Sequence, residues 1–536
     1  MTTPMRAADL VAQRLYEAGC RHAFGMPGGE VLTLVDALEA VGIEFVLCKH
    51  ENAAGFMAEG AHHVIGAPAI LVATVGPGAM NGVNVVANAH QDRVPMIVLT
   101  GCVDPDEALT YTHQVLDHRA VFDEITKASF TLTAEGADII ADKAVGIARE
   151  GREGPVHIDV PISVADAIAA PKARRRAIAA PVAPAGDDLA TAQAWLSEAV
   201  RPVIIAGLDV MKDATASRLQ SFAEKRGIPV ITTYKAKGVL PESHALALGG
   251  AGLSPLADKH LLPFVRSSDL ILCVGYDPIE MRPGWREIWD PDETRVIDIS
   301  AVSNTHYMHQ ATLNFVADTG ATLEVLDHAE IPSVWTGGEI DTLKSALADA
   351  FPRDDVWGPA AVIDVCRRML PDTTIATADS GAHRILLSQM WTCYAPKTLL
   401  QSSALCTMGC AVPLAMGAKY ADPERCVVSF SGDAGFLMVA GELSTAAEHG
   451  HNTIFVVFVD ASLALIELKQ RQRQMANRGV DFGRHDFAAM GRAFGGYGHT
   501  VSNRTELEAA LTEAQQADTF TVIAAVIDRQ SYDGRI

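Results

Sequence analysis

The segment from Cys426 to Ile466 constrains the fold more strongly than any other part of the chain. Residues 427–430 form an apolar run that predicts a buried strand, and residues 453–459 form a second one. A helical pattern over 439–448 lies between them. Strand, turn, helix and strand make a βαβ unit, in which both strands run parallel and end at the same edge of the sheet. The chain is therefore predicted to form open α/β sheets with a site at that edge.

Two aspartates follow these predicted strands, Asp433 after the first and Asp460 after the second. Both carboxylates can bind one hard cation, which often bridges a protein to a phosphate. The glycines beside Asp433 allow backbone N–H groups and a helix N-terminus to approach that phosphate closely. The pattern thus indicates a magnesium-bound diphosphate. Two aspartates in ordinary turns are the alternative, because a single glycine-rich turn is weak evidence.

The same segment resembles the signature of thiamine diphosphate enzymes, in which Gly-Asp-Gly is followed further along the chain by Asn-Asn. Here Ala434 stands in place of the second glycine, and Val459-Asp460 stands in place of the asparagine pair, as in catabolic acetolactate synthases. The resemblance implies three metal ligands: Asp433, Asp460 and the carbonyl of Ser462. It implies cofactor contacts from three residues of the turn: Gly432, Ala434 and Gly435. A carboxylate binds Mg²⁺ at least as well as a carboxamide, so the metal prediction holds despite the differences.

Length and composition set limits on the architecture and on the partners. A chain of 536 residues is too long for one core and predicts about three domains. A net charge of −22 argues against nucleic-acid and anionic-membrane partners. The nine cysteines form no Cys-x-x-Cys pair, and the sequence shows neither a signal peptide nor a run of 18 apolar residues. We therefore predict a cytoplasmic protein with no nucleic-acid or membrane partner.

Residues 1–170 alternate predicted helices and strands, which indicates a doubly wound parallel sheet. Glu51 lies at the carboxyl end of a predicted strand, 44–48, and precedes a predicted helix, 53–64. On local grounds Glu51 can simply be a charge favoured at a helix N-terminus. The further strands predicted in this domain are 22–24, 69–74, 95–100 and 156–160.

The stretches HENAAGFMAEG and VATVGPGAMN resemble the pyrimidine-binding domain of acetohydroxyacid synthase-like enzymes. The resemblance implies that Glu51 is catalytic: it hydrogen-bonds N1′ of the aminopyrimidine, and a buried carboxyl suits this proton sharing. It also implies cofactor contacts from Pro27, Gly28 and Asn81. The THQ…ITK stretch resembles catabolic acetolactate synthases and implies a catalytic Gln114 near the substrate, with His113 beside it. An exposed loop is the alternative for His113 and Gln114.

A linker rich in alanine, proline and arginine, 165–190, precedes a second predicted α/β domain, 190–345. The strands predicted in this central domain are 202–206, 229–233, 270–274 and 295–299. No Gly-x-Gly-x-x-Gly follows any of them, so a dinucleotide site is only weakly indicated. The stretch VGYDPIEMRPGWREIW resembles FAD-independent catabolic acetolactate synthases and lacks the RFDDR-type segment of FAD-containing ones. We therefore predict no FAD.

The third predicted domain, 355–536, begins after the break at Phe351–Asp355. By resemblance, Ala382 and His383 contact the diphosphate. Met408 matches the apolar residue that holds the cofactor in its bent shape, although a core methionine is the alternative. Cys406 stands where synthases usually have glycine. Predicted strands at 374–377 and 521–527 complete this domain.

The resemblance to the acetolactate synthase family spans essentially the whole chain. It implies three doubly wound parallel-sheet α/β domains, namely pyrimidine-binding, central and diphosphate-binding. It implies thiamine diphosphate- and Mg²⁺-dependent decarboxylation of a 2-oxo acid, pyruvate, with carboligation to a second 2-oxo acid. The alternatives are a nonoxidative 2-oxo acid decarboxylase, a noncatalytic cofactor-binding paralogue and a flavin-linked oxidase. A homodimer or homotetramer with active sites between subunits is expected from the same resemblance.

The acceptor side is where this sequence departs from the family. Leu465 and Lys469 are possible substrate residues that stand where anabolic synthases carry Met and Trp, and catabolic synthases carry Gln in place of Lys469. A cation at Lys469 can receive an acidic group of a substrate in a cleft of low dielectric. It can equally be an exposed lysine on an amphipathic helix, and the sequence leaves both interpretations open.

Overall fold

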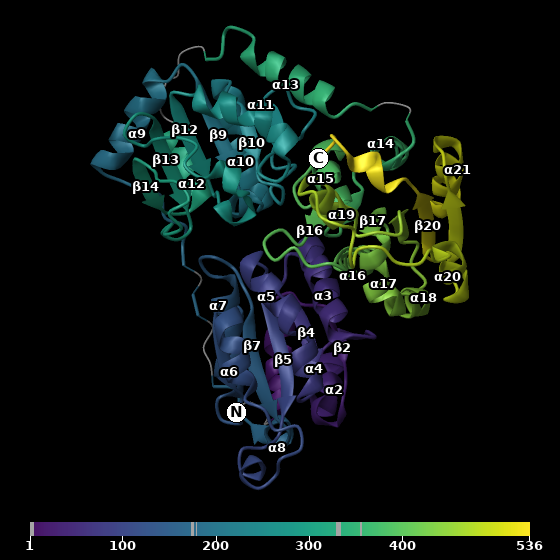
Figure 1. Cartoon of the computed structure of the whole chain (residues 1–536). Coiled ribbons are helices and arrows are strands. Elements are labelled where there is room, and N and C mark those ends of the chain that lie inside the picture. The colour runs from purple at the N-terminus through teal and green to yellow at the C-terminus, as the bar shows by residue number, and fades with distance from the viewer. Residues whose placement is uncertain (1–4, 173–175, 178, 328–333, 354–355) are drawn as a thin grey trace.

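The computed structural model describes residues 5–172, 176–177, 179–327, 334–353 and 356–536. Within these residues the chain folds into three six-stranded sheets, and every strand pairing inside them is parallel. Figure 1 shows the three α/β domains, with the N-terminal one at the bottom and the C-terminal one on the right. The predicted fold class is confirmed. Parts of the predicted linker, 173–175 and 178, and of the predicted break, 354–355, lie outside the described residues.

The N-terminal sheet has the strand order β3-β2-β4-β5-β7-β6. Its strands are β2 (His22–Met26), β3 (Glu44–Leu47), β4 (Ala69–Ala73), β5 (Met96–Cys102), β6 (Ala128–Thr131) and β7 (Val156–Pro161). Its helices are α1 (Ala7–Glu17), α2 (Leu32–Ala40), α3 (Glu51–Ile65), α4 (Pro77–Asn81), α5 (Val83–Gln91), α6 (His118–Phe122), α7 (Ala137–Arg149) and α8 (Ile162–Asp166). A short antiparallel pair joins β1 (Met5–Arg6) to β8 (Ile168–Ala169). The strand order reverses between β2 and β4, so their carboxyl ends border a crevice where ligands commonly bind.

The central sheet has the order β11-β10-β9-β12-β13-β14. Its strands are β9 (Pro202–Ala206), β10 (Val230–Thr232), β11 (Ala247–Gly250), β12 (Leu270–Val274), β13 (Arg295–Ser300) and β14 (Leu313–Val316). Its helices are α9 (Asp187–Glu198), α10 (Asp213–Arg226), α11 (Pro255–Arg266), α12 (Thr319–Leu326) and α13 (Glu339–Ala350). The order reverses between β9 and β12.

The C-terminal sheet has the order β16-β15-β17-β18-β20-β19. Its strands are β15 (Ile375–Ala378), β16 (Leu399–Gln401), β17 (Val427–Gly432), β18 (Ile454–Val459), β19 (Tyr497–Val501) and β20 (Thr521–Val526). Its helices are α14 (Pro359–Met369), α15 (Ala382–Met390), α16 (Ala411–Ala421), α17 (Asp433–Val439), α18 (Leu443–His449), α19 (Ala464–Gln472), α20 (Phe487–Ala493) and α21 (Arg504–Ala514). The order reverses between β15 and β17, which places the turns after these two strands at one crevice.

The helix predicted over 439–448 is wrong in its start. Helix α17 begins at Asp433, directly after β17, and a 3-10 turn at Ala440–Glu442 separates it from α18. Gly435 lies in the first turn of α17. A Cβ there would stand 1.9 Å from Asp379 Oδ2, so only glycine fits at this position. The glycine-rich stretch is therefore partly helical. Tight packing against Asp379, rather than chain flexibility, requires the glycine at position 435.

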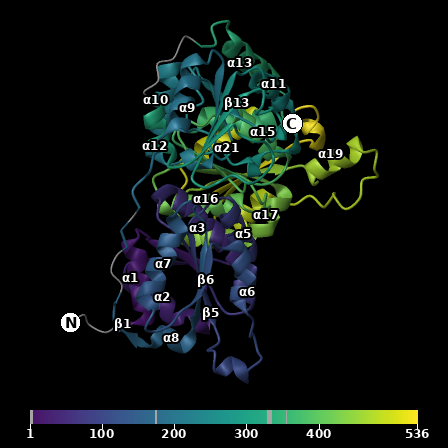
Figure 2. The same ribbon diagram turned by 90° about the vertical axis from the view of Figure 1, so that its left-hand side faces the viewer.

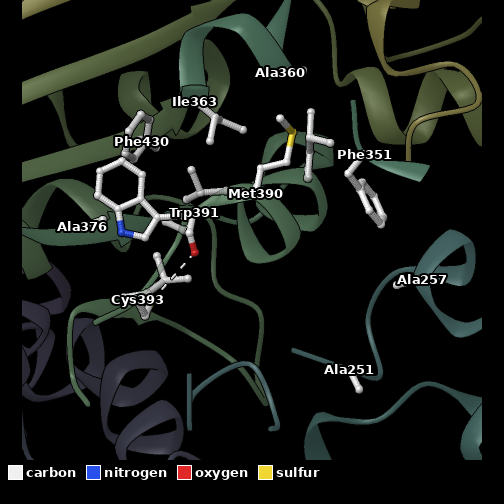
Figure 3. Close-up of a cluster of buried hydrophobic side chains, with 14 of the residues drawn as sticks. Ala251, Ala257, Phe351, Ala360, Ile363, Ala376, Met390, Trp391, Cys393 and Phe430 are labelled. Carbon is white, nitrogen blue, oxygen red and sulfur yellow. Dashed lines mark hydrogen bonds between the residues drawn. The ribbon is translucent and has the colours of Figure 1, made fainter. Parts of the chain in front are cut away.

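A large apolar cluster supports the strands that lead to this crevice. Figure 3 shows Trp391 beside Phe430, whose rings lie 5.4 Å apart, together with Ala376 and Ile363. Phe430 belongs to β17 and Ala376 to β15, so the cluster fixes both strands from one side. The cluster continues to Ala251 and Ala257 of the central domain.

The N-terminal and C-terminal domains pack directly on each other within one chain. Helix α3 lies against α16, where a Cβ on Gly417 would stand 1.9 Å from the carbonyl oxygen of Met57. Lys235 of the central domain forms an ion pair of 3.0 Å with Asp92 of the N-terminal domain. Asp92 in turn accepts hydrogen bonds from the backbone N–H groups of Ser403 and Ala404 in the C-terminal domain. The three domains therefore meet at one buried polar contact.

In the part of the chain that the structure describes, every helix is too short or too polar to span a bilayer.

Candidate active site

A cavity of about 510 Å³ opens at the carboxyl ends of β15, β17 and β18. The turns that follow these strands line it, together with the segment that joins β16 to α16. The central domain closes its other side at three places: Tyr234, Leu253 and Ile279–Pro283. The cavity thus lies at the strand-order reversal where a site is expected in this kind of sheet.

Asp433 is the first residue of α17 and is 2% exposed. Its Oδ2 accepts hydrogen bonds from the backbone N–H of Asp460 (3.1 Å) and of Ala461 (2.8 Å), and its Oδ1 accepts one from Ala434 N–H (2.8 Å). Burial raises the pKa of this carboxyl group, and the three N–H donors partly offset that effect. These contacts hold the ends of β17 and β18 together.

Asp460 lies next to Asp433 and is the more perturbed of the two acids. Burial, followed by the nearby charge of Asp433, raises the pKa of Asp460 to about 7. Asp460 Oδ1 accepts a hydrogen bond from Ser462 N–H (3.0 Å), and Ser462 Oγ donates to Asp481 (2.9 Å). The described residues contain no cluster of three or more acidic, histidine or cysteine side chains suited to a metal. Two carboxylates and a carbonyl would leave the remaining positions of a hard cation to phosphate oxygens.

His383 occupies the turn after β15 and fits a buried phosphate contact. The residue is 4% exposed, and burial lowers the pKa of its ring to about 3, so the ring is neutral. It lies against Gly381 and Gly432, where a Cβ would stand 2.6 Å and 3.3 Å from the ring. Nε2 of His383 and Oγ of Ser380 have no hydrogen-bond partner among the described residues. Orphaned donors in a cradle lined by glycines suit a diphosphate.

Met408 lines the same cavity and is half-buried. Its turn is fixed by Asp379, which accepts hydrogen bonds from Gly409 N–H (3.0 Å) and Cys410 N–H (3.2 Å). Asp379 is fully buried, and burial raises its pKa to about 6. Asp379 is not among the predicted site residues, although an aspartate directly after a buried strand is the same signal that marks Asp433.

Cys406 adopts a φ of 57°, the left-handed region in which glycine carries no penalty. Its Sγ lies 3.2 Å from Ser403 O and accepts a hydrogen bond from Arg384 (3.2 Å). The loop therefore keeps the backbone conformation that a glycine favours, with the thiol held by local contacts.

A second group of predicted residues gathers in the N-terminal domain, around the ends of β2 and β4. Glu51 is the first residue of α3 and is 4% exposed. It accepts a hydrogen bond of 2.9 Å from Asn81, and a Cβ on Gly78 would stand 3.1 Å from its Oε1. A helix-terminal charge would normally remain in water, whereas this carboxylate is buried against backbone.

The other predicted residues of this domain lie at the same edge. Gly28 approaches Thr74, which donates a hydrogen bond to Glu30 (2.6 Å). Gln114 lies beside Gly76 and has a φ of 58°. Pro27, Asn81, His113 and Gln114 are exposed in the single chain.

The two groups do not meet within one chain. The residues that line the C-terminal cavity include none of Pro27, Gly28, Glu51, Asn81 and Gln114. The predicted substrate residues also separate. Leu465 lines the cavity, whereas Lys469 is exposed on α19, which projects from the domain together with the segment that follows it (Figure 2).

Comparisons with known proteins agree with this arrangement. Three family profiles match: "Thiamine pyrophosphate enzyme, N-terminal TPP binding domain" over 5–121, its "central domain" over 189–326 and its "C-terminal TPP binding domain" over 379–525. The chain is 30% identical to "Acetolactate synthase" of Bacillus subtilis, covering 98% of this chain and 93% of that protein. It is 28% identical to "Acetolactate synthase, catabolic" of Raoultella terrigena, covering 97% and 95%. It is 29% identical to "Acetolactate synthase isozyme 1 large subunit" of Escherichia coli, covering 94% and 91%.

Proposed function

Since the chain belongs to the acetolactate synthase family of thiamine pyrophosphate enzymes, we propose that it decarboxylates pyruvate and joins the remaining fragment to a second 2-oxo acid. Thiamine pyrophosphate and thiamine diphosphate are two names for one cofactor. The observation that carries the proposal is the pair of residue groups described above, one in the N-terminal domain and one in the C-terminal domain, which we call half-sites. One presents a buried Glu51, and the other presents Asp433, Asp460 and a neutral His383.

The residues of the C-terminal cavity fit the diphosphate and a magnesium ion. Asp433, Asp460 and the Ser462 carbonyl would hold the metal, and His383 with the turn after β17 would hold the diphosphate. When bound, thiamine diphosphate supplies a carbanion that adds to the ketone of a 2-oxo acid and accepts the electron pair left by CO₂. Glu51 would share a proton with the aminopyrimidine ring, and Met408 would support the cofactor from below.

Metal binding should depend on pH because Asp460 must lose its proton to become a ligand. Its pKa is about 7 without metal, so protons compete with Mg²⁺ below that value. We expect the apparent Mg²⁺ affinity to fall about tenfold for each pH unit below neutrality and to level off above it. Titration with Mg²⁺ at several pH values, followed by tryptophan fluorescence, measures this dependence. Asp460→Asn should bind more weakly with a flat pH profile, and an unchanged slope in that variant would contradict the assignment.

The central domain supports the proposal that this enzyme works without FAD. At the strand-order reversal, a Cβ on Gly207 would stand 2.5 Å from the carbonyl oxygen of Gly275, so backbone fills the space between these two turns. A cavity of about 630 Å³ opens beside them and is lined by Leu208, Asp209 and Ala301. Asp209 lies against Gly275 and accepts a hydrogen bond from Ala301 N–H (3.0 Å). A carboxylate at this position would repel the phosphates of a dinucleotide. Protein purified without a flavin absorption band is the expected result.

Exposed apolar residues support a homodimer or homotetramer in which two subunits complete each active site. In the single chain Leu109, Tyr111, Val115 and Leu116 are exposed around Gln114, and Met438 of α17 is 63% exposed. These residues lie beside the two half-sites, so one interface could cover both. The separation of Glu51 from the C-terminal cavity within one chain also supports active sites that two subunits complete.

The test of the reaction is pyruvate turnover with added thiamine diphosphate and Mg²⁺, analysed for acetolactate and acetaldehyde together. Acetolactate as the main product is the expected result. Acetaldehyde alone would assign the chain to the nonoxidative decarboxylases. A protein that binds the cofactor and consumes no 2-oxo acid would be a noncatalytic paralogue.

A further inference from the structure

Two arginines from different domains face the same cavity. Arg384 lies on α15 of the C-terminal domain, and Arg282 lies in the central-domain segment that closes the cavity. Their charges interact, because Arg384 is among the groups that lower the pKa of Arg282. Neither position belongs to the metal or diphosphate contacts described above.

Arg384 is held rigidly although it forms no ion pair within the described residues. Its side chain is largely buried, and it donates hydrogen bonds to the carbonyl oxygen of Ser402 and to Cys406 Sγ. One partner is a carbonyl oxygen and the other is the sulfur of a cysteine, which is a weak acceptor. Neither is a carboxylate that would balance the positive charge of the guanidinium next to the cavity. The side chain is thus pre-organised, with its charge directed by the loop that precedes α16.

Arg282 is half-buried and has no side-chain hydrogen bond or ion pair to the described residues. Burial lowers its pKa, and the charge of Arg384 lowers it further. The charge of Asp258 raises the pKa of Arg282, although the two side chains do not form an ion pair. Tyr234 and Cys406 are the other titratable groups near this guanidinium.

Neighbouring polar side chains also lack protein partners at this end of the cavity. Gln401 is 1% exposed and lines the cavity, and both atoms of its amide are without a hydrogen-bond partner among the described residues. The same holds for Ser403 Oγ. Two cations, one buried and one half-buried, and unpaired polar atoms lining one cavity are unfavourable unless an anion binds there.

We propose that Arg282 and Arg384 bind a second acidic group of the acceptor, so that the enzyme joins the fragment from pyruvate to a 2-oxo dicarboxylic acid as well as to a second pyruvate. This proposal rests on the proposed function and names its substrate class. The diphosphate is assigned to the turns after β15 and β17. The groups around Arg282 are Tyr234 and Asp258 of the central domain, Cys406, and Arg384, which follows His383 on α15. Apolar walls from Leu253, Ile279 and Leu465 suit a short aliphatic spacer between the two acidic ends. Lys469, which the sequence offers as the cation for such a group, is exposed outside the cavity.

The experiment uses the complete oligomer loaded with thiamine diphosphate and Mg²⁺. Calorimetric titration compares glutarate with pentanoate, two unreactive probes that differ in the second carboxylate. We expect glutarate to bind roughly 10–100-fold more tightly, the range of a charge-assisted contact. Arg282→Gln should remove this preference. Arg286→Gln, a matched change at an exposed position four residues along, should retain it.

A second variant and a cofactor titration keep the test decisive. Arg384→Gln should also reduce the preference, and if it misfolds, Arg282→Gln alone carries the test because Arg282 lies in a partly exposed loop. Equal binding of glutarate and pentanoate by the wild type would overturn the proposal. So would a loss of thiamine diphosphate affinity in Arg282→Gln that matches its loss of glutarate affinity, since the pair would then serve the diphosphate.

The two hypotheses fail separately. If pyruvate yields no product while the glutarate preference depends on Arg282, the proposed reaction is wrong and the anion site stands. If acetolactate forms while glutarate shows no preference, the anion site is wrong and the reaction stands.

Discussion

Glu51→Gln should lower pyruvate turnover by roughly 10²–10⁴-fold, the range that a positioned acid–base group contributes. Glutamine keeps the size of the side chain and can still accept a hydrogen bond from Asn81 through its carbonyl oxygen. It cannot take up a proton from the aminopyrimidine. Steady-state assays under saturating thiamine diphosphate and Mg²⁺ measure the effect. Cofactor affinity, measured by fluorescence titration, should change far less than turnover.

The control for this substitution is Glu135→Gln, the same change at an exposed position of the same domain. This control should behave as the wild type. Turnover of Glu51→Gln within a factor of two or so of the wild type would show that Glu51 is only a helix-terminal charge. Full biological activity without turnover would instead indicate a noncatalytic role for the whole protein.

Asp433→Asn should weaken Mg²⁺ binding by about 2–5 kcal/mol, which is roughly 30- to several-thousand-fold, because a buried cation would lose a charged partner. Activity should fall with it and recover only in part at high Mg²⁺. A carboxamide oxygen in place of Oδ2 can still accept the bonds from Asp460 N–H and Ala461 N–H, whereas the amide nitrogen cannot accept the bond from Ala434 N–H, so the contact between the ends of β17 and β18 should loosen as well. Titration calorimetry with Mg²⁺ and thiamine diphosphate measures the binding loss, and thermal unfolding measures the loosening.

The matched control is Asp349→Asn, an aspartate exposed on α13. Its Mg²⁺ affinity and melting temperature should equal those of the wild type. Unchanged Mg²⁺ affinity in Asp433→Asn would remove Asp433 from the metal site and leave it a purely structural turn residue.

Mixing these two inactive variants tests the assembly. If Glu51 of one subunit serves the cavity of another, a hybrid dimer of Glu51→Gln and Asp433→Asn subunits contains one intact site. Random exchange should then restore about a quarter of the wild-type sites. If each site belonged to one chain, no combination would restore activity.

The local sequence predicts the buried strands of this fold and misses the strands at the sheet edges. Strands β4, β5, β12 and β18 are buried on both faces, so each is a continuous apolar run that is visible without any partner. Edge strands β6, β14 and β19 are only half-buried, and their mixed composition gives no clear strand signal, so they were not predicted. The start of α17 at Asp433 was missed for a related reason, because the contact of Gly435 with Asp379 is invisible locally.

The sequence by itself determined the parallel α/β architecture, the aspartates at the ends of β17 and β18, and the glutamate that opens α3. These follow from short-range patterns, since an apolar run and the turn after it are set by neighbouring residues. Only the tertiary structure decided that Glu51 is buried against Gly78, that Lys469 lies outside the cavity, and that Arg282 and Arg384 line the same cavity. The two arginines are about a hundred residues apart in different domains, and no local pattern records which distant charges the packing of three domains brings together.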